Sequence, residues 1–305
     1  MKSFLDERIE KEVKSIKWLL QPGQLIDDAI AKGAWEPMTT KVVEHFVRPG
    51  MTCIDIGANM GYYTLLMAKL VGSSGFVLSI EPMIDPFEMV YKQASLNGFQ
   101  NIGYLGCGLS DEHVELKNKL FNYSWPPAAV EQKGQNIDLT TLDEITFGKA
   151  IPNSSSQDGF TLDENTKGHS GILLADLSNS WCGTNVLKAA RPKPFIKIDT
   201  DGYELKIIRG GMKTLAVSHP TMIIEVCDYT LRGVAGLNDD TNYIYGTCVV
   251  EMLTLLKSIG YHLYYEEEFY QKNQWKEVVL LEGLLERFDL SKVSTNLVCS
   301  FDKLS

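Results

Sequence analysis

Short apolar runs alternate with amphipathic stretches along the first third of the chain. The runs 51–56, 76–80 and 102–107 are of a length and composition that predict buried strands. Between them, residues 62–70 and 85–97 have apolar positions at helical spacing. The alternation of strand and helix predicts parallel βαβ units, and therefore a doubly wound α/β sheet.

The same alternation returns in the last third of the chain, where it predicts further strands and helices. The predicted strands are 195–198, 222–226, 261–265 and 297–301, and the predicted helices are 203–216 and 246–259. Residues 146–192 have no sustained period and several Gly and Ser residues, so we interpret them as an insertion or long loop.

Residues 1–50 are interpreted as an N-terminal helical arm that precedes a main domain over residues 51–305. An amphipathic helix is predicted for residues 4–20, because apolar residues recur there near helical spacing. Gln21-Pro22-Gly23 would end it, and a second short helix is predicted over 38–47.

Composition excludes several classes of function. Hydrophobic residues make up 44% and charged residues 22%, which is enough apolar material for a core. The formal net charge of −10 disfavours nucleic acid as a partner. No run of ~18 uncharged apolar residues predicts a membrane span, and the first residues lack a secretory pattern, so a cytoplasmic protein is expected. Scattered Cys and His residues predict no zinc site.

The turn after the first strand of the main domain is a candidate ligand loop. It runs from Asp55 to Gly61, where glycines allow a sharp turn and close approach of a ligand to the backbone. Glu81 ends the next strand and is placed to accept hydrogen bonds from a ribose diol. The dinucleotide fingerprint is absent, because Asn59 stands at its second glycine position. A nucleoside without phosphates, such as S-adenosylmethionine, fits this acidic loop better, although a plain βα turn stays open.

A second group of polar residues follows the strand at 195–198. Lys197 and Asp199 share one face of that strand, and Asp201 and Glu204 follow at its carboxyl end. Open α/β sheets bind ligands at this edge. Glu225 adds another acid from the next strand. Crowded carboxylates raise one another's pKa or recruit a cation. A Mg²⁺ site is therefore one alternative interpretation of these acids. Another is a plain βα turn in which Asp201 is the helix N-cap.

Several motifs, in order, resemble the FkbM family of S-adenosylmethionine-dependent methyltransferases. The resemblance covers about residues 33–228. Asp201 departs from it, because the family usually has Glu there, and the segment from Asp143 to Lys197 is longer than the family norm. The matching motifs are Gly50–Thr64, Ile80-Glu81-Pro82, Thr141-Leu142-Asp143, Ile196–Glu204, Gly210-Gly211 and Pro220 with Ile224-Glu225.

The resemblance implies the class I methyltransferase fold, a Rossmann-like, seven-stranded, mostly parallel sheet with helices on both faces and one antiparallel strand near the edge. It also implies O-methylation, often of a sugar hydroxyl, with S-adenosylmethionine as the cofactor. Carried over by position, the residues expected to bind the cofactor are Asp55, Gly57, Ala58, Asn59, Gly61, Tyr62, Tyr63, Thr64, Glu81, Pro82, Cys107, Gly108 and Asp199.

Deprotonation of an alcohol near neutral pH requires a base, and no histidine lies in a motif. We therefore expect a carboxylate base, Asp199 first and Asp201 or Glu204 second, with Lys197 stabilising the alkoxide or pairing with Asp199. A small-molecule substrate such as a glycan or glycolipid is expected, bound by Trp35, Glu36, Trp181, Glu225 and Tyr243. The alternatives are a Mg²⁺-dependent O-methyltransferase and a non-enzymatic or divergent S-adenosylmethionine-binding module.

Overall fold

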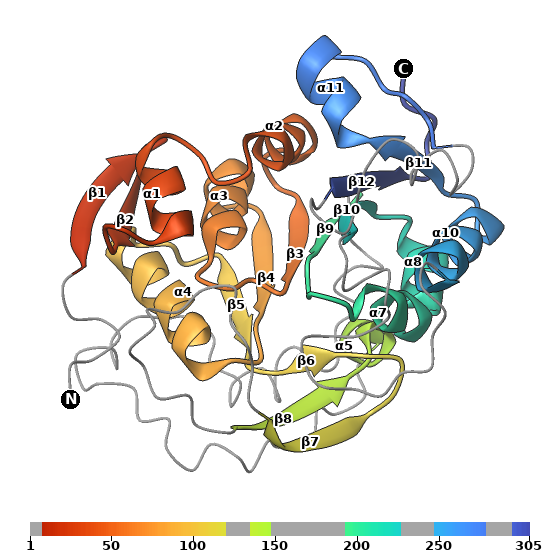
Figure 1. Cartoon of the computed structure of the whole chain (residues 1–305), viewed down its shortest axis with the longest axis horizontal. Helices are drawn as coiled ribbons and strands as arrows, with labels where there is room; N and C mark the ends of the chain where they lie inside the picture. The colour runs from red at the N-terminus through yellow and green to blue at the C-terminus, as the bar shows by residue number, and fades with distance from the viewer. Residues whose placement is uncertain (1–7, 120–134, 148–192, 227–246, 279–294) are drawn as a thin grey trace.

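A computed structural model describes residues 8–119, 135–147, 193–226, 247–278 and 295–305 (Figure 1). Its centre is a seven-stranded sheet of order β11-β12-β10-β9-β3-β4-β5. Only β12, next to one edge, runs antiparallel to its neighbours in this sheet. The expected class I methyltransferase architecture is therefore confirmed. The strands are β3 (Thr52–Ile56), β4 (Phe76–Ile80), β5 (Ile102–Leu105), β9 (Phe195–Ile198), β10 (Thr221–Val226), β11 (His262–Tyr265) and β12 (Thr295–Ser300).

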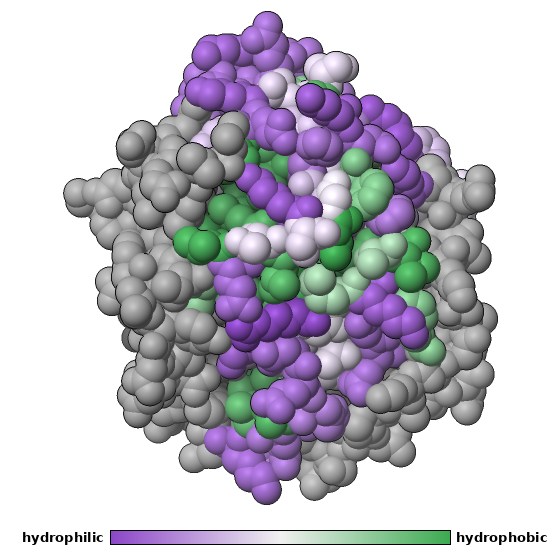
Figure 2. All heavy atoms as spheres, turned by 90° about the vertical axis from the view of Figure 1, so that its right-hand side faces the viewer, coloured by the Kyte–Doolittle hydropathy of each residue, from purple (hydrophilic) through white to green (hydrophobic). Residues whose placement is uncertain are grey.

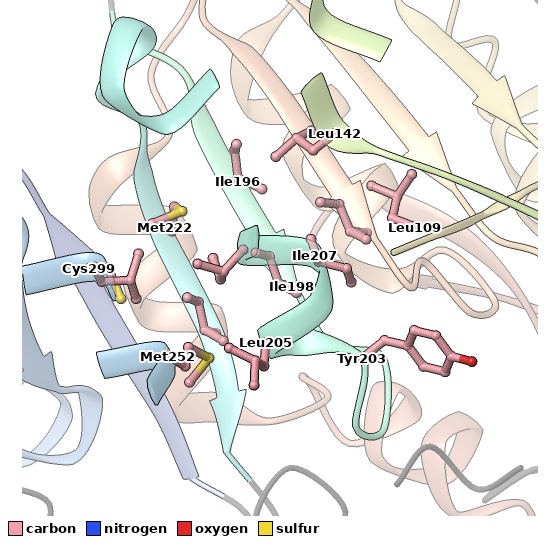
Figure 3. Packing of buried hydrophobic residues seen from close by; sticks show 14 of the residues in the cluster. Leu109, Leu142, Ile196, Ile198, Tyr203, Leu205, Ile207, Met222, Met252 and Cys299 are labelled. Atoms are coloured by element: carbon pink, nitrogen blue, oxygen red, sulfur yellow. The ribbon is translucent and has the colours of Figure 1, made fainter. Parts of the chain in front are cut away.

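Helices cover both faces of the sheet, and each face has its own hydrophobic core. Successive side chains of a strand point to opposite faces, so Cys53 packs into one core and Ile54 into the other. One face carries α2 (Pro37–Phe46), α3 (Tyr62–Val71) and α4 (Ile84–Leu96), and the other carries α7 (Glu204–Gly210) and α10 (Thr247–Ser258) (Figure 1). On the second face, Ile198 and Met222 of the strands lie near Leu205 of α7 and Met252 of α10 (Figure 3).

The helix predicted over residues 4–20 is wrong, because residues 9–20 form a β-hairpin of β1 (Ile9–Val13) and β2 (Ile16–Leu20). Val13 pairs with Ile16, which leaves Lys14 and Ser15 as a two-residue turn, and both have positive φ. This is the turn geometry that matches the twist of paired strands. Ile16, Trp18 and Leu20 are buried on one face of β2, and this period of two replaces the expected helical period.

Two side chains anchor the hairpin to the main domain: Gln93 within α4, and Asn97 directly after this helix. Asn97 accepts a hydrogen bond from the Lys17 amide at 2.8 Å and donates one to the Lys17 carbonyl at 2.7 Å. Buried Gln93 accepts from the Leu19 amide and donates to the Met60 carbonyl. The N-terminal strands therefore extend the core that also contains α3. The division of the chain at residue 50 stays a prediction.

The helix expected over 203–216 is divided into α7 and α8 (Met212–Ser218) at Gly210-Gly211. A Cβ at Gly210 would overlap the carbonyl oxygen of Ser110, so glycine permits the close approach of the two segments. Asp143 then accepts hydrogen bonds from the amides of Lys213 and Thr214, in the first turn of α8. The Thr141-Leu142-Asp143 motif thus caps a helix, rather than facing the edge where the candidate site lies.

Several shorter elements were not expected. They include a small sheet of order β6-β8-β7, whose Gly108 packs against the Leu139 side chain. Most of the predicted insertion, and the whole of residues 148–192, lies outside the described residues. The unexpected elements are α1 (Leu25–Ala31), β6 (Gly108–Leu109), β7 (Val114–Lys119), β8 (Gln135–Thr140), α5 (Leu142–Phe147) and α11 (Glu266–Lys272).

The face on the side of α10 and α11 is mostly hydrophilic among the described residues, with hydrophobic groups gathered near its middle (Figure 2). Within the described ranges, we find no helix with both the length and the apolar character that crossing a bilayer requires.

Candidate active site

The acids singled out in the sequence meet at the carboxyl ends of four neighbouring strands. In the sheet order, β4, β3, β9 and β10 are adjacent and parallel. Glu81 follows β4, the loop that begins at Gly57 follows β3, Asp199 follows β9, and Glu225 lies near the end of β10. The sequence prediction that these residues share one edge of the sheet is therefore confirmed, whereas their individual roles remain predictions.

The loop after β3 touches the end of β9 directly. Gly57 has φ +80°, and its amide donates to the Ile80 carbonyl of β4 at 3.0 Å. The amide of Asp199 donates to the Ile56 carbonyl at 3.1 Å. A Cβ at Gly57 would overlap the Asp199 carbonyl oxygen. Glycine is required here both for its backbone conformation and for this close approach.

Replacing Gly57 by alanine is expected to lower the free energy of unfolding by about 2–4 kcal/mol, because a strained φ and a steric overlap act together. Gly23→Ala is a matched control, since Gly23 has φ +88° but no atom within 4 Å of the position that an added Cβ would take. Urea unfolding measures both variants. Equal losses in the two variants would show that the contact with Asp199 contributes nothing.

Asp55 is buried beneath α3, and only 1% of it is exposed. Its Oδ2 accepts a hydrogen bond from the Thr64 hydroxyl at 2.6 Å. Burial raises the pKa of Asp55, and the charge of Lys197 opposes that shift. Asp55 Oδ1 is buried and has no hydrogen-bond partner among the described residues. The hydrogen bond between Asp55 and Thr64 thus holds the first turn of α3 against β3.

The Glu81 side chain accepts hydrogen bonds from the backbone of two loops, the loop after β3 that begins at Gly57 and the loop after β4. Its Oε2 accepts from the Asn59 amide at 2.8 Å, and its Oε1 accepts from the Met83 amide at 2.9 Å. Burial, together with the charges of Asp55 and Asp201, raises the pKa of Glu81 to about 7 despite these hydrogen bonds. Each carboxylate oxygen keeps a second lone pair, which leaves acceptor capacity for a ligand hydroxyl.

Lys197 and Asp199 form the central ion pair of the site. Lys197 Nζ lies 2.5 Å from Asp199 Oδ2, and the two side chains are 2% and 25% exposed. Nζ also lies 4.6 Å from the ring centroid of Tyr63. Burial disfavours the charge of Lys197, but Asp199, Glu36 and Asp55 outweigh it and raise the lysine's pKa. Burial alone would raise the pKa of Asp199, yet the ammonium group holds it below its usual range.

Glu36 faces this pair from the N-terminus of α2. It has a left-handed backbone, with φ 41°, and it immediately precedes Pro37 at the helix start. Its Oε2 accepts a hydrogen bond from the Tyr63 hydroxyl at 2.9 Å. Burial, and next the charge of Asp199, raise the pKa of Glu36. A left-handed glutamate is uncommon, and here it places an acid beside Lys197.

Glu204 shapes the loop after β9. It is fully buried, and its Oε1 accepts from the Thr200 amide at 3.0 Å and from the Thr200 hydroxyl at 2.9 Å, while its Oε2 accepts from the Gly202 amide at 3.0 Å. Asp201, within that loop, has φ 51°. Partial removal from water, and then the charges of Asp199 and Glu204, raise the pKa of Asp201 to about 7.

A polar network behind Glu36 was missed by the sequence reasoning. Glu266, only 1% exposed, accepts from the Thr39 hydroxyl at 2.9 Å and from the Asn296 side-chain amide at 3.2 Å. Asn296 also donates to Thr39 Oγ1. The network joins α2, α11 and β12. Burial raises the pKa of Glu266 to about 7. Only the polar Asn296 within an apolar strand signals this network in the sequence.

Several other predicted binding residues make packing contacts within the fold, and their binding roles stay predictions. Tyr62 stacks on Trp18 with ring centroids 5.3 Å apart, and its hydroxyl lies 3.1 Å from Thr40 Oγ1. Trp35 is half-buried and packs against the core around α3, and Cys107 is buried beside β6. Trp181 and Tyr243 lie outside the described residues. Three predicted residues remain. Ala58 and Gly61 lie in the loop after β3, and Pro82 lies in the loop after β4.

The donor and acceptor set of this edge fits S-adenosylmethionine. Asp55 Oδ1 and Asn59 Oδ1 are buried acceptors with no hydrogen-bond partner among the described residues. Buried acceptors favour a ligand that brings donors and positive charge, as the ammonium, sulfonium and ribose hydroxyls of this cofactor do. A pyrophosphate would meet carboxylates instead. In the described part of the chain, no three His, Cys, Asp or Glu side chains are grouped so that they could hold a metal ion.

A family model matches most of this chain. The model of the methyltransferase FkbM domain matches residues 55–263, more than half of the chain. A crystal structure of methyltransferase FkbM from Methylobacillus flagellatus aligns with a TM-score of 0.42 and 14% identity, over 85% of this chain and 50% of that one.

Two curated relatives, both named protein-L-isoaspartate O-methyltransferase, match shorter segments. The one from Methanothrix thermoacetophila is 32% identical over 59 residues, which is 19% of this chain and 28% of the relative. The one from Methanococcus maripaludis is 26% identical over 103 residues, which is 33% of this chain and 45% of the relative. The aligned segments thus span less than half of either relative. By the match to the domain model, the chain belongs to the FkbM methyltransferase domain family, whose cofactor is S-adenosylmethionine.

Proposed function

We propose that this protein transfers a methyl group from S-adenosylmethionine to a hydroxyl oxygen of a sugar or a sugar-containing small molecule, and that Asp199 accepts the hydroxyl proton. The observation that carries the proposal is the Lys197–Asp199 pair at the carboxyl end of β9. It lies beside the Gly57 loop, and the carboxylate of Asp199 is partly open to solvent.

The cofactor would be held by the residues around the ends of β3 and β4. The loop from Gly57 to Gly61 would hold its methionine part, and Glu81 its ribose. When bound, S-adenosylmethionine supplies a methyl group on a sulfonium that is already a good leaving group. The task of the chain is therefore alignment of the acceptor oxygen and removal of its proton.

A carboxylate with a low pKa suffices as the base. The hydroxyl proton becomes strongly acidic as the new C–O bond forms, so an ionised carboxylate accepts it late in the reaction. Lys197 keeps Asp199 ionised and fixes the position of one of its oxygens. Glu204 is placed less well as a base, because it is buried and its carboxylate oxygens accept hydrogen bonds from its own loop.

The negative charge at this edge of the sheet supports a neutral hydroxyl as the methyl acceptor. Among the described residues of the site, Lys197 is the cation, and the acids Asp199, Glu36 and Asp55 lie around it. Phosphorylated or carboxylated groups would be repelled from this edge, whereas a neutral hydroxyl would not. Two relatives are named O-methyltransferase, which supports oxygen as the methylated atom without favouring a hydroxyl. We keep the expectation of a small-molecule acceptor, such as a glycan or glycolipid, and of a cytoplasmic protein.

Two measurements test this function. Titration calorimetry with S-adenosylmethionine is expected to show saturable binding, and NADH is expected to show none. Methyl-labelled cofactor is then incubated with a panel of methyl glycosides and their deoxy analogues, and the products are treated with mild alkali. Alkali-stable label on the hydroxyl compounds alone supports a methyl ether. Release of the label as methanol would identify a methyl ester and contradict the proposal.

The same assay separates the alternatives. A binding module would retain calorimetric binding but transfer no label to any acceptor. A Mg²⁺-dependent enzyme would lose transfer on addition of a chelator and regain it with MgCl₂. We expect transfer to be insensitive to chelator, because the described acids form ion pairs and hydrogen bonds instead of a metal-binding group.

A further inference from the structure

Glu225 is a buried acid that the proposed reaction leaves without a role. It lies on β10, directly beside β9, and only 8% of it is exposed. The register pairs Ile224 with Ile198, so Glu225 and Asp199 follow at neighbouring positions of the two strands, and their carboxyl groups interact. Its Oε2 is buried and receives no hydrogen bond from any described residue. An unpartnered carboxylate oxygen next to another carboxylate is unfavourable unless a proton lies between the two groups.

The surroundings of the two acids decide where that proton resides. Asp199 Oδ2 is 2.5 Å from the ammonium group of Lys197, so Asp199 is the member of the pair that stays ionised. Glu225 faces Asp199, Asp201 and Glu204, and no cation contacts it in the described residues. On its other side, β12 presents the uncharged Asn296. With the proton on Glu225, the charges of Lys197, Asp199 and Glu225 sum to zero, which a buried site tolerates best.

We propose that Asp199 and Glu225 share a single proton, held on Glu225, and that Glu225 thereby positions Asp199 to accept the proton of the methyl acceptor. The role of the pair in catalysis rests on the function proposed above, whereas the shared proton does not. Lys197 holds one oxygen of Asp199, and Glu225 donates a hydrogen bond to the same carboxylate. The free lone pairs of Asp199 are then directed away from both partners, toward the open side of the site.

The proton balance of the reaction follows from this arrangement. The pair begins with one proton and one negative charge. As the C–O bond forms and the C–S bond breaks, the hydroxyl proton passes to Asp199, so the pair holds two protons. One of them passes to water when the products leave. Glu225 is therefore a positioning residue, and Asp199 is the group that touches the acceptor.

Glu225→Gln tests the shared proton without any ligand. The amide has nearly the same shape and donates a hydrogen bond, but it does not titrate. Burial and the facing carboxylates raise the pKa of Glu225, so the folded state keeps a proton that the unfolded chain loses above about pH 4.3. The free energy of unfolding of the wild type should therefore fall relative to that of the variant as the pH rises from 4.5 to 8.5.

Urea unfolding across this range measures the difference, with Glu112→Gln, an exposed position, as the matched control. Infrared spectra at pH 8 should contain a protonated-carboxyl band in the wild type that Glu225→Gln lacks and Glu112→Gln keeps. A difference in unfolding free energy that does not change with pH, or the absence of this band, would overturn the shared proton. Neither readout depends on methyl transfer, so both remain interpretable if the proposed function fails.

Turnover then tests the positioning role. Glu225→Gln is expected to lose less turnover than Glu225→Leu, because the amide still donates a hydrogen bond to Asp199. Glu225→Leu removes the donor and is expected to lower turnover about 10- to 100-fold, the range for loss of a hydrogen bond to a charged group. Loss of turnover in both variants would identify Glu225 itself as the base. Unchanged turnover in both would remove it from the reaction.

Discussion

Asp199→Asn is expected to lower turnover at least about 100-fold and to leave the dissociation constant of S-adenosylmethionine within a few-fold of the wild-type value. The amide keeps the shape of the side chain, and its oxygen can still accept from Lys197. What it loses is the negative charge and the ability to take a proton. The backbone of Asp199, which contacts the Gly57 loop, is unchanged by the substitution.

Label transfer measures turnover in this variant, and calorimetry measures cofactor binding. Glu112→Gln controls for the general effect of removing an acid, because it is exposed and distant in sequence from the site. Near-wild-type turnover in Asp199→Asn would exclude Asp199 as the base. Loss of cofactor binding together with turnover would instead assign the residue to the cofactor site.

Lys197→Met is expected to lower the free energy of unfolding by about 3–5 kcal/mol, the range for removal of one partner from a buried ion pair. Methionine fills a similar volume beside Tyr63 but carries no charge. Asp199, Asp55 and Glu36 then face one another without a cation, so their pKa values rise. The loss should be larger at pH 8 than at pH 5, because the uncompensated acids ionise as the pH increases.

Urea unfolding at the two pH values tests this expectation. Lys117→Met is the matched control, since Lys117 forms a surface ion pair with Glu115 at 3.5 Å, which contributes at most about 1 kcal/mol. Adding Asp199→Asn to Lys197→Met should recover part of the lost stability, because it removes one of the unpaired charges. A loss that is the same at both pH values would contradict the electrostatic explanation.

The central sheet could be predicted because its strands are buried on both faces. Runs such as 76–78 and 222–224 are continuously apolar, and parallel strands covered by helices have that pattern. The hairpin could not be distinguished from a helix, because Ile9, Val13, Ile16 and Leu20 are compatible with both periods. Its turn is Lys14-Ser15, which lacks the Asn-Gly or Asp-Gly signature of such turns.

The edge of the sheet that carries the site could be predicted from the sequence, but the side-chain contacts within the site could not. Position after a strand places Asp199 and Glu225 at the same edge. It does not say that Glu204 turns inward to bind its own loop, since a helix-start glutamate can equally face solvent. Nor does it place the charge of Glu36 near that of Lys197, because this proximity depends on the tertiary packing of α2 against α3.

The Thr39–Glu266–Asn296 network has a consequence for the order in which the protein matures during synthesis. Thr39 lies in the helix that begins immediately after Glu36, but its partners are 227 and 257 positions later in the chain. The ribosome therefore exposes this helix long before the strand that anchors it has been made. We therefore expect the acids around Lys197 to reach their final arrangement late, after β12 has emerged and paired with β10.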